Sequence, residues 1–336
     1  MNNKVTMQDI ADSLGVTKVS VSKALNLQPG VGDELRQRII ETAEEMGYVG
    51  TKRFTAGKIS RTFAYIVTKR YFIEADNFYN VIIYYLGKKC TESASRLYSF
   101  VLSEDDEKNR VIPHYLTEQK PDGIFLVGEM GEEYIIALKT LDIPLVAVDF
   151  SNPMLDIDCV IPDNYGMAMY TASYLYRNGH RKIGFVGDIK ASVNILDRYM
   201  GYKKALAVFS LPEREDWVIS DIGSNSKYTL DFALPADMPT AFICHCDAAA
   251  YYLIQKLRAC GMSVPEDVSV VSFDNTEMAV RCVPGITTMN IDKKAIAYRS
   301  VSVMTARIEN ASAAPRANVY PDLGELIVRS SVKAIQ

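Results

Sequence analysis

The sequence has no apolar run long enough to span a membrane, which takes about 20 residues. Its amino terminus carries one basic residue, Lys4, but no apolar core follows it. A secretory signal needs such a core, so the sequence indicates neither a membrane protein nor a secreted one. We therefore expect a cytoplasmic protein without a membrane partner.

Cysteine and histidine are scarce, with six and three residues in a chain of 336. The cysteines are scattered and mostly lie in apolar runs, which favours buried free thiols over a disulfide framework. Cys244, His245 and Cys246 are adjacent, but a closed zinc site needs further ligands and no second Cys/His pair lies near in sequence. We expect no metal. The cysteines stand at positions 90, 159, 244, 246, 260 and 282.

Common catalytic motifs are also missing. There is no GxSxG, no Walker loop and no GxGxxG after a predicted strand, so we expect neither an enzyme nor a cofactor. Charge of one sign is not in excess either: the formal net charge is -4, and the first 58 residues hold eight Lys/Arg against seven Asp/Glu. A role in nucleic-acid binding therefore depends on where the charges fall, and not on bulk charge.

The chain is long enough for two or three domains, and its 48% apolar and 23% charged residues are typical of globular proteins. From residue 62 onward, short apolar runs alternate with helical stretches, which predicts parallel sheets with right-handed crossovers. Because one compact sheet cannot hold so many units, we expect two α/β lobes. Strands are predicted over 63–68, 97–102, 123–127, 145–149, 182–187, 240–246 and 268–273, and helices over 78–95, 105–119, 132–141, 164–178, 194–209 and 247–260.

The first 50 residues are predicted to be entirely helical. Thr6, with Asp9 three residues later, can cap a helix over 7–14, and Gly15 can end it in the left-handed conformation. Thr17 can cap a second helix that runs to about residue 25, and a third is predicted over 33–46. Apolar side chains at positions 10, 14, 16 and 21 would form the core between them. This pattern predicts a helix-turn-helix.

Longer segments carry a family likeness. The segment "VTMQDIADSLGVTKVSVSKALN", followed by "VGDELRQRIIETAEEMGY", resembles the DNA-binding head of the LacI/GalR family, and "IPDNYGMAMYTASYLYRNGHRKIGFVG" and "VPEDVSVVSFDN" resemble its body. The likeness implies a helix-turn-helix domain at 1–50, a hinge linker at 51–61, and an effector-binding and dimerisation domain at 62–336. That domain would have two Rossmann-like lobes, as in periplasmic binding proteins. Lobe 1 would hold about 62–159 and 290–321, and lobe 2 about 160–289 and 322–336.

The likeness assigns the DNA contacts to the second helix of the head, which enters the major groove in this family. Lys18 and Val19 correspond to the base-reading pair, and Val19 could contact a thymine methyl group. Lys23 stands where an arginine is common, which puts two-bond recognition of guanine in question. The alternative is that both lysines are solvated charges on a helix face. Thr17, Ser20 and Ser22 are implied to hold phosphates or the helix end.

The linker departs from the family pattern. The stretch from Tyr48 to Lys58 is shorter than usual and lacks the leucine that wedges into the minor groove in family members. Phe54 is the one large apolar candidate for such a wedge, and it could equally pack against the body. Lys52 and Arg53 could contact phosphates.

Two carboxylates mark a candidate effector site in the body. Asp149 and Asp274 each end an apolar run, and ligands of open α/β sheets bind at the carboxyl ends of strands. Arg198, near a predicted helix start, could donate two hydrogen bonds to adjacent hydroxyls or to a carboxylate, and Asn194 lies on the same helix face. By the likeness, Arg198 and Asp274 form the effector clamp. A glycosidase-like pair of Asp149 and Asp274 would leave the head unexplained.

Further effector-binding candidates each have an alternative structural interpretation. Trp217 lies near where family members present an aromatic ring to the sugar, but it could be a core residue. Phe78 and Tyr79 follow the first strand of the body, where a ligand-facing aromatic is frequent, and helix packing is the alternative. Cys246 replaces the Asn that often precedes Asp247, so that ligand contact is in question, although Asp247 could still cap the next helix.

The sequence therefore predicts a sequence-specific transcriptional repressor of carbohydrate-utilisation genes, controlled allosterically by a sugar bound between the two lobes. A homodimer would place two heads on a pseudo-palindromic operator. Alternatively, a DNA-binding regulator with the same architecture could respond to a non-sugar metabolite or to a protein partner.

Overall fold

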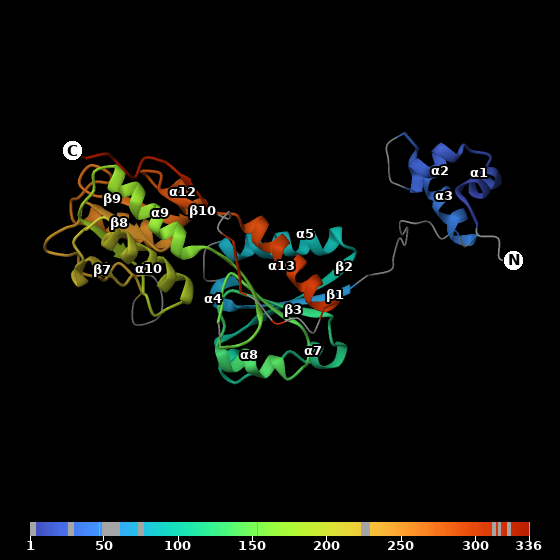
Figure 1. Cartoon of the computed structure of the whole chain (residues 1–336), viewed down its shortest axis with the longest axis horizontal. Helices are drawn as coiled ribbons and strands as arrows, with labels where there is room; N and C mark the ends of the chain where they lie inside the picture. Colours follow the sequence, from blue (N-terminus) through green and yellow to red (C-terminus); the bar gives the residue numbers. More distant parts are fainter. Residues whose placement is uncertain are drawn as a thin grey trace. The chain divides into compact units, whose positions relative to one another are not determined.

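The computed structural model describes residues 5–25, 30–46, 48, 61–72, 77–152, 154–222, 229–310, 314, 317–320 and 324–335. The chain divides into two compact units, Met1–Ile59 and Ser60–Gln336 (Figure 1). The candidate DNA contacts Lys52 and Arg53, and the candidate wedge Phe54, lie outside the described residues.

The first unit is a bundle of three helices: α1 (Met7–Leu14), α2 (Lys18–Leu25) and α3 (Asp33–Glu45). The predicted capping box is confirmed, because the Thr6 N–H donates to Asp9 Oδ2 at 2.7 Å and the Asp9 N–H donates to Thr6 Oγ1 at 3.4 Å. Gly15 ends α1 with φ of 66°, and the Ser20 N–H donates to Thr17 Oγ1 at 3.0 Å. The helices enclose a small apolar core that contains Ile10, Ala11, Val21, Ala24, Leu25, Ile39 and Ala43.

The second unit contains two six-stranded sheets, which agrees with the two α/β lobes predicted from the sequence. The first sheet, in spatial order, is β11 (Ala317–Tyr320), β5 (Asp158–Pro162), β4 (Leu145–Val148), β3 (Gly123–Val127), β1 (Arg61–Thr68) and β2 (Ser95–Leu102). The second is β12 (Gly324–Ile327), β10 (Thr287–Ile291), β9 (Ser269–Asp274), β8 (Ala241–Cys244), β6 (Ile183–Val186) and β7 (Val218–Ile219). Neighbouring strands are parallel except for β12, which pairs antiparallel with β10. We call the first sheet with its helices lobe 1 and the second lobe 2.

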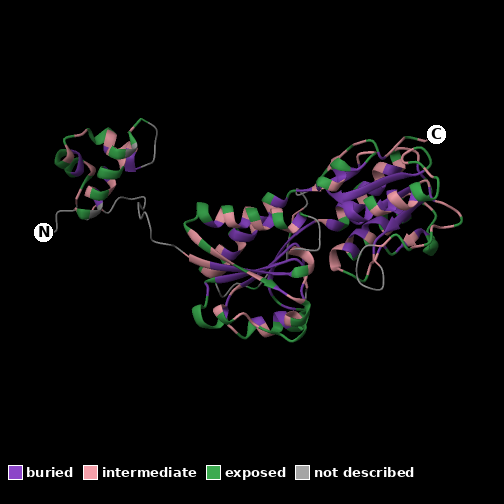
Figure 2. Ribbon diagram, turned by 180° about the vertical axis from the view of Figure 1, so that it is seen from behind, coloured by how far each residue is buried: buried purple, intermediate pink, exposed green. Residues whose placement is uncertain are grey.

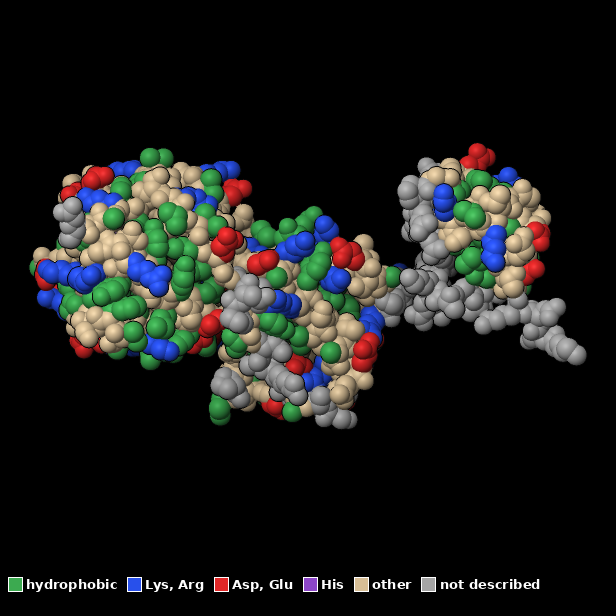
Figure 3. Space-filling model, turned by 45° about the horizontal axis from the view of Figure 1, so that its top comes forward, with side chains coloured by type: hydrophobic (Ala, Val, Ile, Leu, Met, Phe, Trp, Pro, Cys, Tyr) green, Lys and Arg blue, Asp and Glu red, His purple; other side chains and the backbone are tan. Residues whose placement is uncertain are grey.

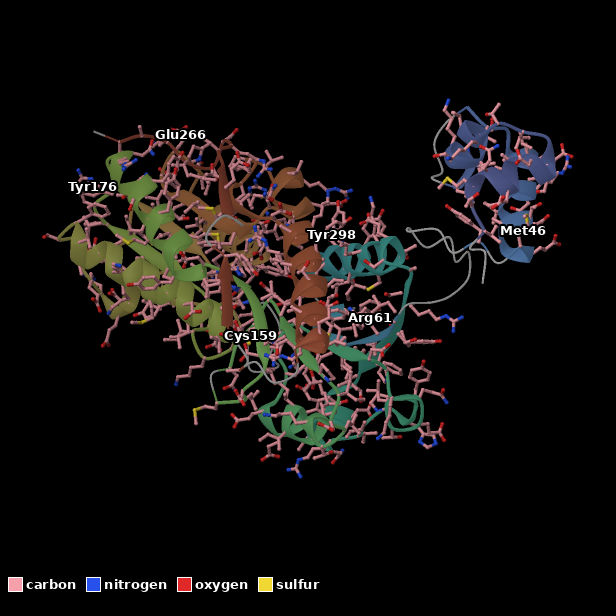
Figure 4. The ribbon with its side chains drawn as sticks, turned by 45° about the vertical axis from the view of Figure 1, so that its right-hand side comes forward. Met46, Arg61, Cys159, Tyr176, Glu266 and Tyr298 are labelled. Atoms are coloured by element: carbon pink, nitrogen blue, oxygen red, sulfur yellow. The ribbon has the colours of Figure 1, made fainter. Side chains whose placement is uncertain are left out.

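Helices cover the sheets and bury most strands on both sides (Figure 2), as parallel sheets require. Tyr298 of α13, labelled in Figure 4, donates to Glu92 Oε1 of α5 at 2.9 Å and so joins two helices of lobe 1. Lobe 1 carries α4 (Lys69–Phe72), α5 (Phe78–Glu92), α6 (Glu104–Lys108), α7 (His114–Gln119), α8 (Glu132–Lys139) and α13 (Lys293–Glu309). Lobe 2 carries α9 (Asn164–Arg177), α10 (Val193–Val208), the 3-10 turn η1 (Glu215–Trp217), α11 (Asp247–Ala259) and α12 (Glu277–Arg281).

One predicted helix is wrong. The stretch 105–119 was expected to be continuous, but it forms two short helices, α6 and α7. Arg110, between them, has φ of 56°, and Pro113 precedes α7. The left-handed Arg110 ends the helical path after α6, and Pro113, which disfavours helical geometry in the residue before it, sets the start of α7.

The cysteines are free thiols, as expected, but not all of them are buried. Cys90, Cys159, Cys244, Cys246 and Cys282 are buried, whereas Cys260 is exposed at the end of α11. No helix among the described residues is long and apolar enough to cross a membrane.

Candidate functional site

The exposed side of α2 carries the residues that the sequence assigns to DNA. Thr17, Lys18 and Val19 are exposed, and Val19 keeps 62% of its accessible surface although it is apolar. The Thr17 and Ser20 hydroxyls lie 2.9 Å apart at the helix start. Ser22 and Lys23 are half-buried, and the opposite side of α2 packs into the core. On the face of the first unit that Figure 3 draws, Lys and Arg are interspersed with Asp and Glu.

Arg36 of α3 holds the far end of α2, and the sequence argument missed it. Its guanidinium donates to the Lys23 and Ala24 carbonyls at 3.4 and 3.2 Å, and to the Val31 carbonyl at 3.2 Å. The last carbonyls of a helix have no partner within the helix, so a guanidinium placed there satisfies them and suits the helix dipole. Arg36 thereby fixes the position of α2 within the bundle.

In lobe 1, the candidate effector residue Asp149 follows β4 with φ of 66° and is only 2% exposed. Tyr79 of α5 donates to its Oδ2 at 3.0 Å. The other oxygen, Oδ1, is buried and has no hydrogen-bond donor among the described residues. Burial raises the pKa of Asp149 to about 7; nearby Asp274 adds to this rise, while the Arg198 charge and the Tyr79 hydrogen bond oppose it.

In lobe 2, Arg198 of α10 is 4% exposed, and each of its three guanidinium nitrogens has a partner within its own lobe. Its Nη2 lies 3.3 Å from Asp274 Oδ1, its Nε donates to Asn164 Oδ1 at 2.9 Å, and its Nη1 donates to the His245 carbonyl. The guanidinium also lies over the Phe273 ring, 4.7 Å from its centroid. Asp274 ends β9 with φ of 99° and is 7% exposed. The two residues predicted to form a clamp are therefore in contact.

Asn194 connects the two lobes. Its amide nitrogen, from α10, donates to the Asp149 carbonyl at 2.7 Å and approaches Asp149 Oδ2 at 3.3 Å. Its amide oxygen accepts from Asn164 at 3.0 Å, and Asn164 in turn accepts from Arg198. We call the resulting group, which comprises Tyr79, Asp149, Asn194, Arg198 and Asp274, the inter-lobe cluster.

Trp217 does not belong to the inter-lobe cluster. It directly precedes β7, and β7 runs parallel to β6, so the ring lies at the amino end of the lobe 2 sheet. Asp274 lies at the carboxyl end. The Trp217 Nε1–H donates to the Asp237 carbonyl at 2.7 Å, and the ring is 1% exposed. Trp217 is therefore a core residue, which was the alternative interpretation from the sequence.

Phe78 and Asp247 also have structural roles that differ from ligand contact. Phe78 is 5% exposed and packs in the core beside Tyr79, whose ring centroid lies 5.1 Å away. Both Asp247 oxygens are occupied: Oδ2 accepts from the Thr276 N–H at 2.6 Å, and Oδ1 accepts from the Thr288 hydroxyl at 2.7 Å and from Ser272. Burial raises the pKa of Asp247 to about 6. Asp247 thus joins β9, β10 and the start of α12, and it does not cap α11 as the sequence allowed, because Cys246 is the N-cap.

A buried His–Asp pair beside the inter-lobe cluster was not identified from the sequence. His245 Nε2 lies 2.9 Å from Asp221 Oδ2, and the Asp188 N–H donates to Asp221 Oδ1 at 3.0 Å. Burial works against a charged ring, but Cys246 and the Asp221 carboxylate raise the pKa of His245 well above its usual value. Asp221 and His245 lie far apart in the sequence, so no local pattern indicates that they pair. In the structure, Asp221 follows β7 and His245 follows β8.

Lys293 was also missed. It is 8% exposed at the start of α13, where its Nζ donates to the Asp274 carbonyl and to the Ile291 carbonyl, the latter at 3.2 Å. The ammonium lies 5.1 Å from the Phe78 ring centroid. Because α13 is in lobe 1 and Asp274 in lobe 2, Lys293 is a second link between the lobes.

No group of three or more His, Cys, Asp and Glu side chains that could hold a metal occurs in the part of the chain that the structure describes. His180, interpreted from the sequence as a structural residue, lies 3.1 Å from the Lys333 carbonyl and 2.9 Å from the Thr240 hydroxyl. Neither observation adds a reactive centre to the inter-lobe cluster.

Comparison with known proteins gives a consistent result for both units. Residues 6–50 match the family of bacterial regulatory proteins, lacI family, and residues 172–332 match a periplasmic binding protein-like domain. The chain is 25% identical over 334 residues to the HTH-type transcriptional repressor PurR of Aliivibrio salmonicida, covering 97% of this chain and 98% of that protein.

Two solved structures share the fold. One is a complex of the transcriptional regulator CelR with cellobiose, with a TM-score of 0.70 and 23% identity over 98% of this chain and 100% of that one. The other is the lac repressor dimer bound to operator and the anti-inducer ONPF, with a TM-score of 0.68 and 18% identity over 99% of this chain and all of that one.

Proposed function

Because the chain belongs to the lacI family of bacterial regulatory proteins, we propose that it represses carbohydrate-utilisation genes and that a sugar bound between its lobes controls this repression. The family makes it a DNA-binding transcriptional regulator and not an enzyme. The repressor would act in the cytoplasm as a homodimer on a pseudo-palindromic operator, since paired heads read paired half-sites.

The observation that carries the effector proposal is the buried Asp149 Oδ1, which has no donor among the described residues. A buried acceptor without a partner costs about 1 to 3 kcal/mol, and a ligand hydroxyl at this position would remove that cost. Arg198, Asn194 and Asp274 lie next to it and offer both donors and acceptors. Sugar hydroxyls both donate and accept, so they suit such a mixed lining.

A purine, as a non-sugar metabolite, is the second candidate effector, because the relative described above is named as the repressor PurR. A flat base stacks on aromatic rings, and the ring that contacts Asp149 is that of Tyr79, which packs beside Tyr71. Their centroids lie 4.7 Å apart with the ring planes tilted by 50°, so the two rings pack on one another and leave no room for a flat base between them. This packing favours the sugar.

For DNA, we propose that Lys18 and Val19 read bases and that Lys23 contacts DNA where an arginine is common in the family. Thr17, Ser20 and Ser22 would hold phosphates or the helix end, and Lys52 and Arg53 would add phosphate contacts. The exposure of the apolar Val19 supports a base contact, because an exposed valine at a helix start gains nothing from solvent. Each contact predicts a loss of operator affinity when it is removed.

A ligand screen tests the effector proposal. Thermal unfolding of the full chain would be followed with a panel of mono- and disaccharides and, separately, of purine bases, for wild type and for Arg198→Ala. We expect a saccharide to raise the Tm of the wild type and to leave Arg198→Ala unchanged. Stabilisation by purines alone would replace the sugar with the second candidate, and an equal shift in Arg198→Ala would place the ligand elsewhere.

A further inference from the structure

Glu129 of lobe 1 accepts a hydrogen bond from lobe 2. It follows β3 by two residues, and its Oε2 accepts from the Val193 N–H at 3.0 Å. Val193 is the first residue of α10, the helix that also carries Asn194 and Arg198. The first N–H groups of a helix have no partner within it, and they carry the positive end of the helix dipole. A carboxylate from the other lobe therefore fits this helix start both by hydrogen bond and by charge.

The loop that carries Glu129 is held rigidly. Arg70 donates to the Glu129 carbonyl at 2.9 Å and pairs with Glu107 at 2.6 Å. Glu107 also accepts from the Gly131 N–H at 2.7 Å, on the other side of Glu129. The loop is thus fixed to lobe 1 at Glu129 and after it, and also before it, where the Gly128 N–H donates to the Val148 carbonyl at 3.1 Å. Movement of α10 relative to lobe 1 must therefore break the Glu129–Val193 contact.

The start of α10 receives contacts from its own lobe and from lobe 1. Within lobe 2, the Ser192 hydroxyl accepts from the Ile195 N–H at 3.2 Å. From lobe 1, Glu129 binds Val193 and the Asp149 carbonyl accepts from Asn194. Burial raises the pKa of Glu129 above its usual value, although the Val193 hydrogen bond and the Arg70 charge oppose the rise. The contact with α10 thus offsets part of the cost of burying the Glu129 carboxylate.

We propose that Glu129 is a positioning residue for the effector: from lobe 1 it holds the start of α10, and this keeps Asn194 against Asp149. This inference rests on the proposed function, because the proposed function makes the inter-lobe cluster the effector site. Without Glu129, α10 would lose a contact with lobe 1, and the amide of Asn194 would move away from Asp149.

The test uses the full chain without any ligand, so that it can fail separately from the effector proposal. Amide exchange at Val193 and the side-chain amide resonances of Asn194 are recorded by NMR for wild type, Glu129→Ala and Glu129→Gln. Glu132→Gln, an exposed residue of the same segment, is the matched control. In Glu129→Ala we expect exchange at Val193 to be about tenfold faster, as for the loss of one hydrogen bond. We also expect the Asn194 resonances to move toward those of a solvated asparagine.

Glu129→Gln keeps an acceptor at the same place, so it should restore the Asn194 resonances in large part, and Glu132→Gln should match wild type. Unchanged exchange at Val193 in Glu129→Ala would overturn the proposal. Faster exchange at Val193 with an unchanged Asn194 amide would also overturn it, because Glu129 would then be only a local helix cap. If Glu129→Ala does not fold, by far-UV circular dichroism, Glu129→Met takes its place, because it keeps the length of the side chain but has no carboxylate acceptor: a shifted Asn194 amide supports the proposal and an unshifted one contradicts it.

Discussion

The two candidate sites of this chain differ in how their side chains are held. On α2, the residues assigned to DNA are exposed, and Val19 leaves 62% of its surface in solvent. In the inter-lobe cluster, Arg198, Asp149 and Asp274 are at most 7% exposed and are already hydrogen-bonded to the protein. A substitution on α2 should therefore change binding with little effect on folding, whereas one in the cluster should change both.

Arg198→Ala should have the largest effect. It leaves Asp274 buried beside Asn164 and the His245 carbonyl without the guanidinium that joins them. Removing one partner of a buried pair costs about 3 to 5 kcal/mol, and we expect a loss of unfolding free energy of that size by urea denaturation. Arg281→Ala is the control, since Arg281 and Glu277 form an exposed pair whose loss should cost less than about 1 kcal/mol. Equal losses in the two variants would contradict the buried clamp.

Lys18→Ala and Val19→Ala test the other side of the comparison. Loss of a base contact costs about 1 to 3 kcal/mol of operator binding, which is about five- to 150-fold in affinity. Both side chains are exposed, so the unfolding free energy should change by less than about 0.5 kcal/mol. The measurement is fluorescence anisotropy with an operator selected from random duplexes, and Glu41→Gln, exposed on α3, serves as the control. Full affinity in both variants would remove them as DNA readers.

Asp149→Asn tests whether the inter-lobe cluster makes the stability of the chain depend on pH. Burial raises the pKa of Asp149 from a usual value of 3.8 to about 7, so between these pH values the folded chain keeps a proton that the unfolded chain releases. Stability attributable to this group is therefore present at low pH and is lost as pH rises toward 7. Asparagine cannot titrate, so the stability difference between pH 5 and pH 8 should shrink by roughly 1 to 4 kcal/mol in the variant. An unchanged pH profile would show that Asp149 titrates normally.

Arg36→Ala should have the smallest effect. Unlike the substitutions on α2, it should change both stability and operator affinity. It removes the donor to the last carbonyls of α2, which costs about 0.5 to 1.5 kcal/mol. We expect a modest loss of stability in the first unit and an operator affinity that falls about two- to tenfold, because α2 is less well positioned. Operator binding as tight as that of the wild type, at reduced stability, would restrict Arg36 to a folding role.

The local features of the head could be read from the sequence because they depend on neighbours along the chain. Thr6 and Asp9 are three residues apart, and Gly15 and Thr17 act within one turn of their own helices. In the body, the predicted strands are present because buried parallel strands are short apolar runs. Asp149 and Asp274 could be placed at strand ends for the same reason.

Long-range pairing could not be read in this way. The three residues that fill the Asp247 oxygens lie 25 to 41 positions away, so its structural role was hidden. Trp217 precedes a strand of only two residues, too short to show which end of the sheet it marks. The antiparallel β12 and the link from Glu129 to Val193 likewise depend on how distant segments meet.

The central claim is that the inter-lobe cluster controls the DNA affinity of the head. The most direct measurement is operator affinity, by anisotropy at fixed salt, with and without the saccharide that stabilises the wild type, for wild type and Arg198→Ala. We expect the saccharide to change wild-type affinity by about five- to 150-fold and to leave Arg198→Ala unchanged. An equal response in the two proteins, or no response in a wild type that binds the saccharide, would contradict the claim that the inter-lobe cluster controls DNA affinity.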